Sequence, residues 1–449
     1  MKKNILPFIA FSILVIQAFG QDSTVSRLSF KDAIKIGLEN NVTLNQQKNQ
    51  LAYTEVNKTS TLLQIAPSID ASVNAYRVDG NSFNQNEGKV INGKIDYVNG
   101  SVNANMPVFN GMNVINTHRQ ASNNNEAQLH QVNRSSQDVI RDVAAQYLTC
   151  LLDQELIRID KENISMQKLQ YDQISAQVEL GSKAEADLYN QEYQLKNAEL
   201  LLVRSRIKLR NDIATLALTI QIDPTTILEV EEVNWDINAL VADTVSLDEM
   251  VALAQGRRSD LKQASYSEKA ARFGYSAVKG RYYPSIYAGA SYGSRYNYIY
   301  GDVNRTFNQQ FTEDNTNFSY GFNVAIPIFY GFRYRSQTAL SKVAYENAKI
   351  RMHNTEVTVK SDVIRAYQNF NDTKTAYGAA NAQLKAAELT YKMEKERYDL
   401  GISTMVQLTT TNQAYVKAKG DFQNAKYNLM FQRLMIAYAT GTLKIEDIP

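Results

Sequence analysis

The sequence predicts a mixed α and β membrane protein that contains an internal tandem repeat, and three observations support this class. Segments of the first half recur in the second half at offsets of 217 and 220 residues. Two stretches without proline, residues 108–223 and 328–448, repeat apolar residues every seven positions, as long packed helices do. Segments between the other prolines alternate apolar and polar residues, as β-strands do. We therefore expect four β-strands and two long helical hairpins in each chain.

The N-terminus has the pattern of a signal peptide, which we predict for residues 1–20. Lys2 and Lys3 precede an apolar run over residues 5–16 that is too short to cross a bilayer, and small residues follow it. The only cysteine of the chain is Cys150. We therefore expect neither an N-terminal lipid anchor nor a disulfide within the chain.

The charge of the chain is nearly balanced, with 48 Lys and Arg against 46 Asp and Glu. Removing Lys2 and Lys3 with the signal peptide leaves a neutral mature chain, which argues against a nucleic-acid partner. After the signal peptide no apolar run approaches the roughly 20 residues of a membrane-spanning helix. A helical membrane protein is therefore not expected.

The tandem repeat divides the chain into residues 21–222, a connecting equatorial segment at 223–245, and residues 246–449. Each repeat opens with a helix-capping pattern, Ser29-x-x-Asp32 and Ser246-x-x-Glu249. The matching segments are LSFKDAIKIGLENN from Leu28 with VSLDEMVALAQGRR from Val245, APSIDASVNAY from Ala66 with YPSIYAGASYG from Tyr283, and ANMPVFNGMN from Ala104 with VAIPIFYGFR from Val324.

A β-hairpin follows the first helix of each repeat, at about residues 68–108 and 285–329, with loops near 79–94 and 299–315. Alternate residues are apolar on one face and are Asn, Ser or Gly on the other, over about the 9 to 11 residues of a tilted transmembrane strand. Each hairpin ends in a proline-to-glycine motif, Pro107 to Gly111 and Pro327 to Gly331. We interpret these four residues as the strand-to-helix junctions, because proline interrupts a ladder and glycine permits a sharp bend.

A long helical hairpin completes each repeat, with its tip near Gly181 or Gly401. The first arm, from Gly111 to Leu180, is about 70 residues and so ~105 Å long if it is one helix. The heptad positions are apolar in both copies: Leu188, Leu195, Leu202, Leu209 and Leu216 in one, and Leu408, Tyr415, Phe422, Leu429 and Ile436 in the other.

Four strands in lipid leave two unpaired edges, and each unpaired backbone group there costs several kcal/mol. Several copies must therefore close one barrel. Two copies give eight strands and a filled interior, whereas three copies give twelve strands and room for a passage. The polar strand faces favour the passage.

At this point the chain resembles the TolC-like outer membrane efflux proteins, in its duplicated opening segment, its proline-initiated strands, the PVFNG and PIFYG motifs, and the tips LGSKAEADL and LGISTMVQL. The resemblance implies a homotrimer with a shared twelve-stranded transmembrane β-barrel that continues into a long periplasmic α-helical coiled-coil barrel. It implies the exit duct of a tripartite efflux or type I secretion system in the outer membrane of a Gram-negative cell. Such a duct exports drugs, toxic compounds, metals or proteins, and has no cofactor.

The resemblance also implies partners and site residues. The partners are outer membrane lipid, a periplasmic adaptor (membrane fusion) protein and an inner-membrane pump of the RND or ABC type. The adaptor would dock at the tips, on Leu180, Gly181, Ser182, Leu400, Gly401 and Ile402. The gate would comprise Asp187, Tyr398, Ser403, Gln407 and Thr410.

This chain departs from the best-known family members at the gate. Ser403 stands where they have an arginine latch, and Gln407 and Thr410 stand where they have two pore-lining aspartates. We therefore expect a polar, uncharged and weakly selective gate. Simpler interpretations exist for two positions: the helix dipole alone favours Asp187 near a helix start, and Tyr398 suits packing between helices.

Other classes of function fit the sequence less well. No nucleophile elbow, phosphate loop or paired-acid motif is present, so we do not expect an enzyme. His118, His130 and His353 lack metal-ligand spacing. Two alternatives remain: a non-conducting coiled-coil anchor or adhesin stalk, and a stand-alone porin. A stalk would carry its membrane anchor once, at one end, and a porin needs no helices of 70 residues.

Overall fold

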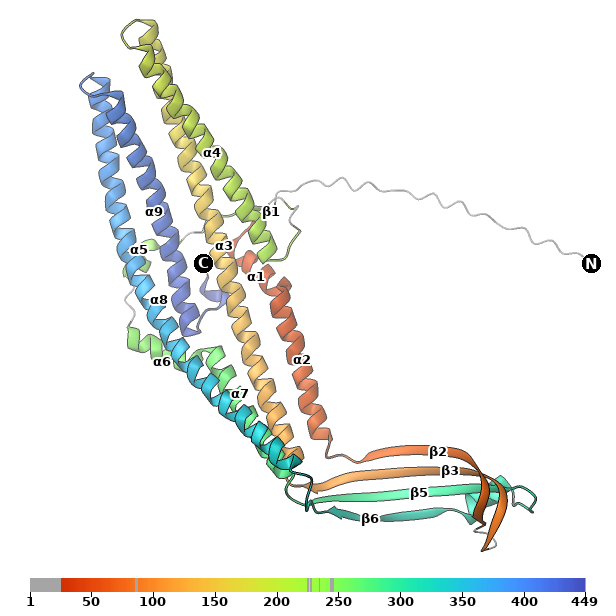
Figure 1. Cartoon of the computed structure of the whole chain (residues 1–449). Coiled ribbons are helices and arrows are strands. Elements are labelled where there is room, and N and C mark those ends of the chain that lie inside the picture. The colour runs from red at the N-terminus through yellow and green to blue at the C-terminus, as the bar shows by residue number, and fades with distance from the viewer. Residues whose placement is uncertain are drawn as a thin grey trace, which may run out of the picture.

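The structure is a computed structural model that describes residues 26–84, 88–223, 226, 228–233, 235–242 and 246–448. It contains a long helical body and a four-stranded sheet, and the sheet projects from one end of the helices at a steep angle (Figure 1). The signal peptide predicted for residues 1–20 lies outside the described residues.

Both halves of the chain contain the same series of long elements. The first half has β1 (Ser26–Leu28), α1 (Phe30–Asn40), α2 (Val42–Leu63), β2 (Ser68–Asn84), β3 (Lys89–Asn110), α3 (Asn113–Glu179) and α4 (Glu185–Thr219). The second half has β4 (Leu228–Val230), α5 (Ile237–Ala242), α6 (Leu247–Arg257), α7 (Ser259–Gly280), β5 (Ser285–Ile299), the π-helix η1 (Gln309–Asp314), β6 (Asn317–Ala325), α8 (Arg333–Asp399), α9 (Met405–Thr440) and the 3₁₀-helix η2 (Ile445–Asp447). Helices α2 and α7 both have 22 residues, and α3 and α8 both have 67. The predicted mixed α and β chain with an internal repeat is confirmed.

The sheet is antiparallel throughout, in the order β2-β3-β5-β6. In the half nearest the helices, its register places most of the apolar residues of the four strands on one face, where Val73 is 74% and Phe322 is 76% exposed. On the other face Ser291 donates a hydrogen bond to Asn103 (2.8 Å), and the amide of Asn103 donates to Asp70 (3.2 Å). The sheet therefore has one apolar face and one polar face, as strands with a period of two require.

The prediction of a loop near residues 79–94 is wrong, because β2 and β3 remain paired over most of this segment. β2 extends to Asn84 and β3 begins at Lys89. Cross-strand pairs stabilise this extension: Arg77 forms a two-pronged ion pair with Asp96 (2.6 and 3.0 Å), and the rings of Tyr76 and Tyr97 stack at 5.1 Å. The polar residues that suggested a loop pair with each other across the two strands.

The free edge of β5 beyond β6 is covered by side-chain amides of the following loop. The backbone N–H of Asn297 donates to Gln310 Oε1 (3.0 Å), and Gln310 Nε2 donates to the Asn297 carbonyl (2.9 Å). Asn304 makes the same pair of bonds with Ile299, at 2.7 and 2.8 Å. We call residues 295–299, with these amides, the amide-capped edge. Side chains there replace a neighbouring strand, so the backbone groups are satisfied.

Each strand-to-helix junction turns on two consecutive residues with left-handed backbone. Gly111 and Met112 have φ of 65° and 63°, and Gly331 and Phe332 have φ of 56° and 59°. A Cβ on Gly111 would lie 1.9 Å from the carbonyl oxygen of Gly280, so only glycine fits. The ladder continues past Pro107 with a register shift, whereas β6 ends before Pro327.

The main hydrophobic core lies in the middle of the helical body, where α1, β1, β4, α3, α4 and α9 meet. Tyr147 of α3 is fully buried there; its hydroxyl donates to the carbonyl of Leu28 (2.7 Å) and accepts from the backbone N–H of Glu231 (3.0 Å). Burial raises the pKa of Tyr147, so the hydroxyl stays a donor. This residue holds β1 and β4 against α3.

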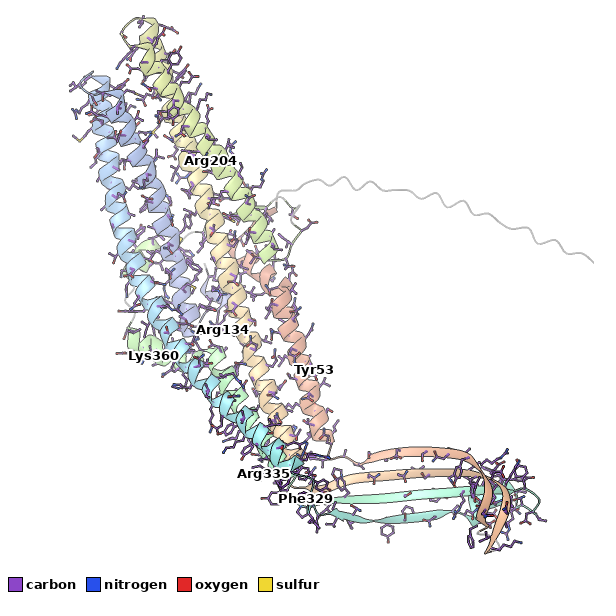
Figure 2. The ribbon with its side chains drawn as sticks, in the orientation of Figure 1. Tyr53, Arg134, Arg204, Phe329, Arg335 and Lys360 are labelled. Carbon is purple, nitrogen blue, oxygen red and sulfur yellow. The ribbon has the colours of Figure 1, made fainter. Side chains whose placement is uncertain are left out.

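A buried arginine connects α7, α8 and α9 within the second half of the chain. Arg258 is 2% exposed; its guanidinium donates to Asp260 (3.0 Å) at the start of α7, to Asp362 (3.1 Å) on α8 and to the carbonyl of Ala439 (3.4 Å) on α9. Arg134 of α3, labelled in Figure 2, lies 3.9 Å from Asp260 and so links the first half of the chain to these groups. We call these groups the arginine junction. Among the described helices, none combines the length and the hydropathy that crossing a bilayer requires.

Candidate functional site

The tips of the two helical hairpins have the same backbone geometry. At the first tip the N–H of Ser182 donates to the carbonyl of Gln177 (2.8 Å), and the N–H of Gly181 donates to that of Val178 (2.9 Å). Ile402 and Gly401 make the equivalent bonds at the second tip, both at 2.9 Å. Both glycines have positive φ, 75° and 72°. Each long helix thus ends in a Schellman motif, which glycine at this position favours.

Apolar side chains are exposed at both tips. Leu180 is 83% exposed beside Gly181, and Leu400 and Ile402 are 74% and 66% exposed beside Gly401. Ser182 is exposed too, but its hydroxyl donates to the carbonyl of Gln177 (2.9 Å). The six residues predicted for adaptor docking therefore lie together at the free end of the helical body (Figure 1). Exposed leucines at a helical end are typical of a contact surface.

Tyr398 lies between the two hairpins and is only 7% exposed. Its ring packs with Ile174, Met405 and Leu408. The ammonium of Lys183, in the first tip, donates to the Tyr398 hydroxyl (3.3 Å) and lies 4.4 Å from the ring centroid. The two tips of one chain are thus connected through a cation–π contact between Lys183 and Tyr398. The sequence alone does not predict this contact.

Asp187 is not brought together with Tyr398 in the single chain. It lies in the first turn of α4 with Glu185, where the helix dipole favours carboxylates. Its side chain has no hydrogen-bond or ion-pair partner in the part of the chain that the structure describes.

Ser403 binds within its own hairpin. Its hydroxyl donates to the carboxylate of Glu394 on α8, and Arg397 donates to the other oxygen of that carboxylate (3.2 Å). Glu394 is 8% exposed, although it is charged. Glu394 is not predicted from the sequence, because a glutamate within a charged helix is usually solvated.

Gln407 and Thr410 make local hydrogen bonds at the start of α9. The N–H of Gln407 donates to Thr404 Oγ1 (3.3 Å), and the Gln407 side-chain oxygen accepts from the N–H of Thr404 (3.1 Å), which is a capping box. The Thr410 hydroxyl donates to the carbonyl of Val406 (2.8 Å). Both side chains are exposed and uncharged.

Further from the tips, one buried and one partly exposed polar pair connect α3 of the first hairpin with α9 of the second. Asn412 donates to Asn163 (3.2 Å), and both are nearly buried. Lys419 donates to Glu162 (2.8 Å), and this hydrogen bond lowers the pKa of Glu162. Polar pairs inside a helical seam fix which residues face each other. The two hairpins therefore have one defined alignment.

The described residues offer no other chemistry at this end of the molecule. Within them, no group of three or more His, Cys, Asp or Glu is arranged to hold a metal ion. Cys150 is fully buried in the core, and burial raises the pKa of its thiol to about 12. The arrangement supports contact and movement of helices at the tips.

Comparison with known proteins gives consistent relatives. A model of the family described as outer membrane efflux protein matches residues 34–220 and 250–442. Outer membrane protein TolC of Vibrio cholerae serotype O1 is 23% identical over 320 residues, which are 70% of this chain and 70% of the relative. Outer membrane protein TolC of Escherichia coli K12 is 23% identical over 281 residues, 62% of this chain and 56% of the relative.

Solved structures share the fold. The outer membrane protein VceC of Vibrio cholerae superposes with a TM-score of 0.80 at 13% identity, covering 92% of this chain and 96% of that one. The CmeC outer membrane channel of Campylobacter jejuni gives a TM-score of 0.78 at 16% identity, covering 93% and 88%.

Proposed function

Because the chain belongs to the outer membrane efflux protein family, we propose that it works as a homotrimer whose sheets close one twelve-stranded β-barrel. As an outer membrane efflux channel the protein is not an enzyme, and it lies in the outer membrane of a Gram-negative cell with its helices in the periplasm. In the proposal the helices of three copies form one coiled-coil tunnel below the barrel. Residues 21–222 and 246–449 are the two repeats of each copy, and 223–245 connect them at the equator.

The observation that carries this proposal is the sheet with two open edges. β2 and β6 each have a strand partner on one side only in the described chain. The apolar face is exposed along all four strands, which suits contact with lipid tails. An open edge in hydrocarbon costs several kcal/mol for each unsatisfied backbone group, so the edges must pair with other copies.

The helices support the same assembly. α3 packs against α7 within the chain. Across the two repeats, α8 corresponds to α3 and α2 corresponds to α7. These two helices do not pack together in the described chain but lie on opposite flanks of the body (Figure 1). α8 exposes Val343, Ile350 and Val357, spaced by seven residues, and α2 exposes Val56 and Leu63 with the same spacing. Packing α8 against α2 of the next copy would repeat the α3–α7 contact and cover both stripes.

The conduit would work with two partners. The adaptor docks on the tips formed by residues 180–182 and 400–402, and an inner-membrane pump of the RND or ABC type supplies the cargo. Small molecules such as drugs, toxic compounds and metals, or proteins, then leave through the tunnel. Tyr398 with Lys183, and Asp187, Ser403, Gln407 and Thr410, form the closed gate at the tips.

Cysteine cross-linking tests the trimer. His130 of α3 stacks on Tyr266 of α7 with ring centroids 5.5 Å apart, and the equivalent positions are Ile350 and Asn49. We expect the variant with Asn49→Cys and Ile350→Cys to give covalent dimers and trimers on mild oxidation. Cys150 is buried and will not interfere.

The matched control joins Asn49→Cys to Leu389→Cys, which is also exposed on α8 but lies 39 residues further along the helix. We expect no covalent trimer from this control. Monomers alone from the first pair, or equal cross-linking from both pairs, would contradict the proposed assembly.

A further inference from the structure

The second repeat carries arginines and tyrosines at the foot of the sheet that the first repeat lacks. Arg281 stands where the first repeat has Gln64, and Arg333 stands where it has Asn113. The tyrosines that have no counterpart are Tyr283, Tyr287, Tyr330 and Tyr334, where the first repeat has Ala66, Asp70, Asn110 and Val114. The duplication shows that the junction fold does not require these residues.

These side chains surround a cavity of about 400 Å³ beside the second junction. It is lined by Arg281, Tyr283, Tyr287, Tyr330, Arg333 and Tyr334. Arg281 donates to Gln337 (2.7 Å), and Tyr330 and Tyr334 stack with ring centroids 4.9 Å apart. No carboxylate lines the cavity, and neither arginine has an ion-pair partner among the described residues. Two guanidinium groups without a carboxylate partner, beside aromatic rings, have the chemistry that binds aromatic anions.

The cavity opens on the polar face of the sheet. Tyr287 pairs with Asn323, whose side chain belongs to that face. Tyr287 also lines a second cavity, of about 470 Å³, with Asn103, Ser291 and Ser319 further along the same face. Polar space thus continues from the foot of the sheet toward its far end. In the proposed channel this face is the inner wall.

We propose that Arg281 and Arg333 form an anion-binding collar at the foot of the barrel, which takes aromatic carboxylates and sulfonates as passing cargo. The inference rests on the proposed channel, because only barrel closure turns the polar face inward. The guanidinium groups bind the charged group of the cargo, and the tyrosine rings stack on its aromatic part. Three copies place three such sites around one opening.

Equilibrium dialysis with 1-naphthalenesulfonate, on the full-length protein in a non-ionic detergent, tests the site without requiring conduction. We expect the double variant Arg281→Gln and Arg333→Gln to bind the sulfonate about tenfold more weakly. The neutral 1-naphthalenesulfonamide should bind wild type and variant alike. The double variant Arg281→Lys and Arg333→Lys, which keeps both charges, should lose less affinity for the sulfonate than the glutamine variant.

The matched control is Arg335→Gln. Arg335 lies two residues from Arg333 at the same elbow (Figure 2) and is exposed. It does not line the cavity of about 400 Å³; it lines an adjoining cavity of about 260 Å³, which shares Tyr330, Arg333 and Tyr334 with the first but lacks Arg281. Its loss should leave sulfonate binding unchanged. Equal weakening by Arg335→Gln, or unchanged binding in the double glutamine variant, would overturn the collar.

Planar-bilayer recording separates this inference from the proposed function. We expect the double glutamine variant to shift the reversal potential in a KCl gradient toward cations and to lose block by 1-naphthalenesulfonate. A wild-type protein that binds the sulfonate but does not conduct would refute the channel and leave the binding site. A conducting protein whose block is unchanged by the substitutions would refute the collar alone.

Discussion

At Gly441, which follows α9, a Cβ atom would clash with a neighbouring segment, so the position is restricted to glycine. Its φ is 74°, and a Cβ there would lie 2.9 Å from Cα of Arg258, in the arginine junction. The equivalent residue after α4 is Gln221, which has φ of 56° and makes the same turn. The turn alone therefore tolerates another residue, and it is the neighbouring backbone of Arg258 that requires glycine at position 441.

Two glycine-to-alanine variants test this difference. Gly441→Ala should destabilise the protein by about 2 kcal/mol or more, because the new methyl group meets backbone atoms that cannot move aside. Gly378→Ala, in the interior of α8, should stabilise it by about 0.5–1 kcal/mol, because nothing lies within 4 Å of the added Cβ. Thermal melting by circular dichroism measures both. Equal melting temperatures for Gly441→Ala and wild type would show that the close approach of Gly441 to Arg258 does not affect stability.

Single residues also set the limit of prediction from sequence. The tips at Gly181 and Gly401 could be predicted, because glycine at a helix end indicates a left-handed turn, and both glycines have positive φ. Gln221 makes an equivalent turn with no such signal. A role for Lys183 could not be predicted, because its contact is with Tyr398, which is 215 residues away in the sequence. Contacts of this kind depend on how two hairpins align, which the periodicity of one helix does not contain.

The first hairpin, α3 with α4, contains a buried carboxylate. Asp153 on α3 has a side chain that is 1% exposed and forms an ion pair with Lys208 on α4; Asp212 lies 3.4 Å from the same ammonium. Burial and the hydrogen bond with Asp212 raise the pKa of Asp153 to about 6, against the opposing effect of Lys208. Ionised Asp153 therefore depends on Lys208 for its stability.

Lys208→Met should cost about 1–3 kcal/mol at pH 7.5, since it leaves an unpaired carboxylate in the core. The cost should shrink at pH 5. Because the folded pKa lies above that of the unfolded chain, protonation of Asp153 below pH 6 favours the folded state. Melting curves of the variant and wild type at both pH values check this. Lys196→Met, which removes only a surface pair with Glu199, should change little at either pH; a pH-independent loss in Lys208→Met would refute the argument.

Whole elements were predicted to different degrees. The heptad pattern anticipated two long helical hairpins, because a period of seven is dictated by helix geometry alone. The upper part of the first β-hairpin was missed, because Arg77 with Asp96 and Lys94 with Asp79 satisfy each other across strands. Charge pairing of that kind is invisible until the register is known.

At the scale of the whole molecule, the contact between Lys183 and Tyr398 connects the two hairpins at their free end. In the proposed gate, Lys183→Met should weaken closure by about 0.5–1 kcal/mol per copy, which favours opening of each copy about two- to fivefold. The closed-state conductance should rise by at least that factor. Planar-bilayer recordings measure this. Lys196→Met, on the same hairpin, is the control, because the ion pair of Lys196 is with Glu199 on its own helix. Equal conductance in Lys183→Met and wild type would remove Lys183 from the gate.

The amide-capped edge has a consequence for the shape of the pore mouth. β6 has nine residues and β2 has seventeen. In the proposed trimer, β6 of one copy would therefore cover only about half of β2 of the next. Since Gln310 and Asn304 already occupy the backbone groups of β5 beyond β6, no strand can fill the gap. The rim of the assembled barrel would therefore be uneven, with three low gaps between three taller hairpins. Molecules outside the cell would first reach the interior of the barrel through these gaps.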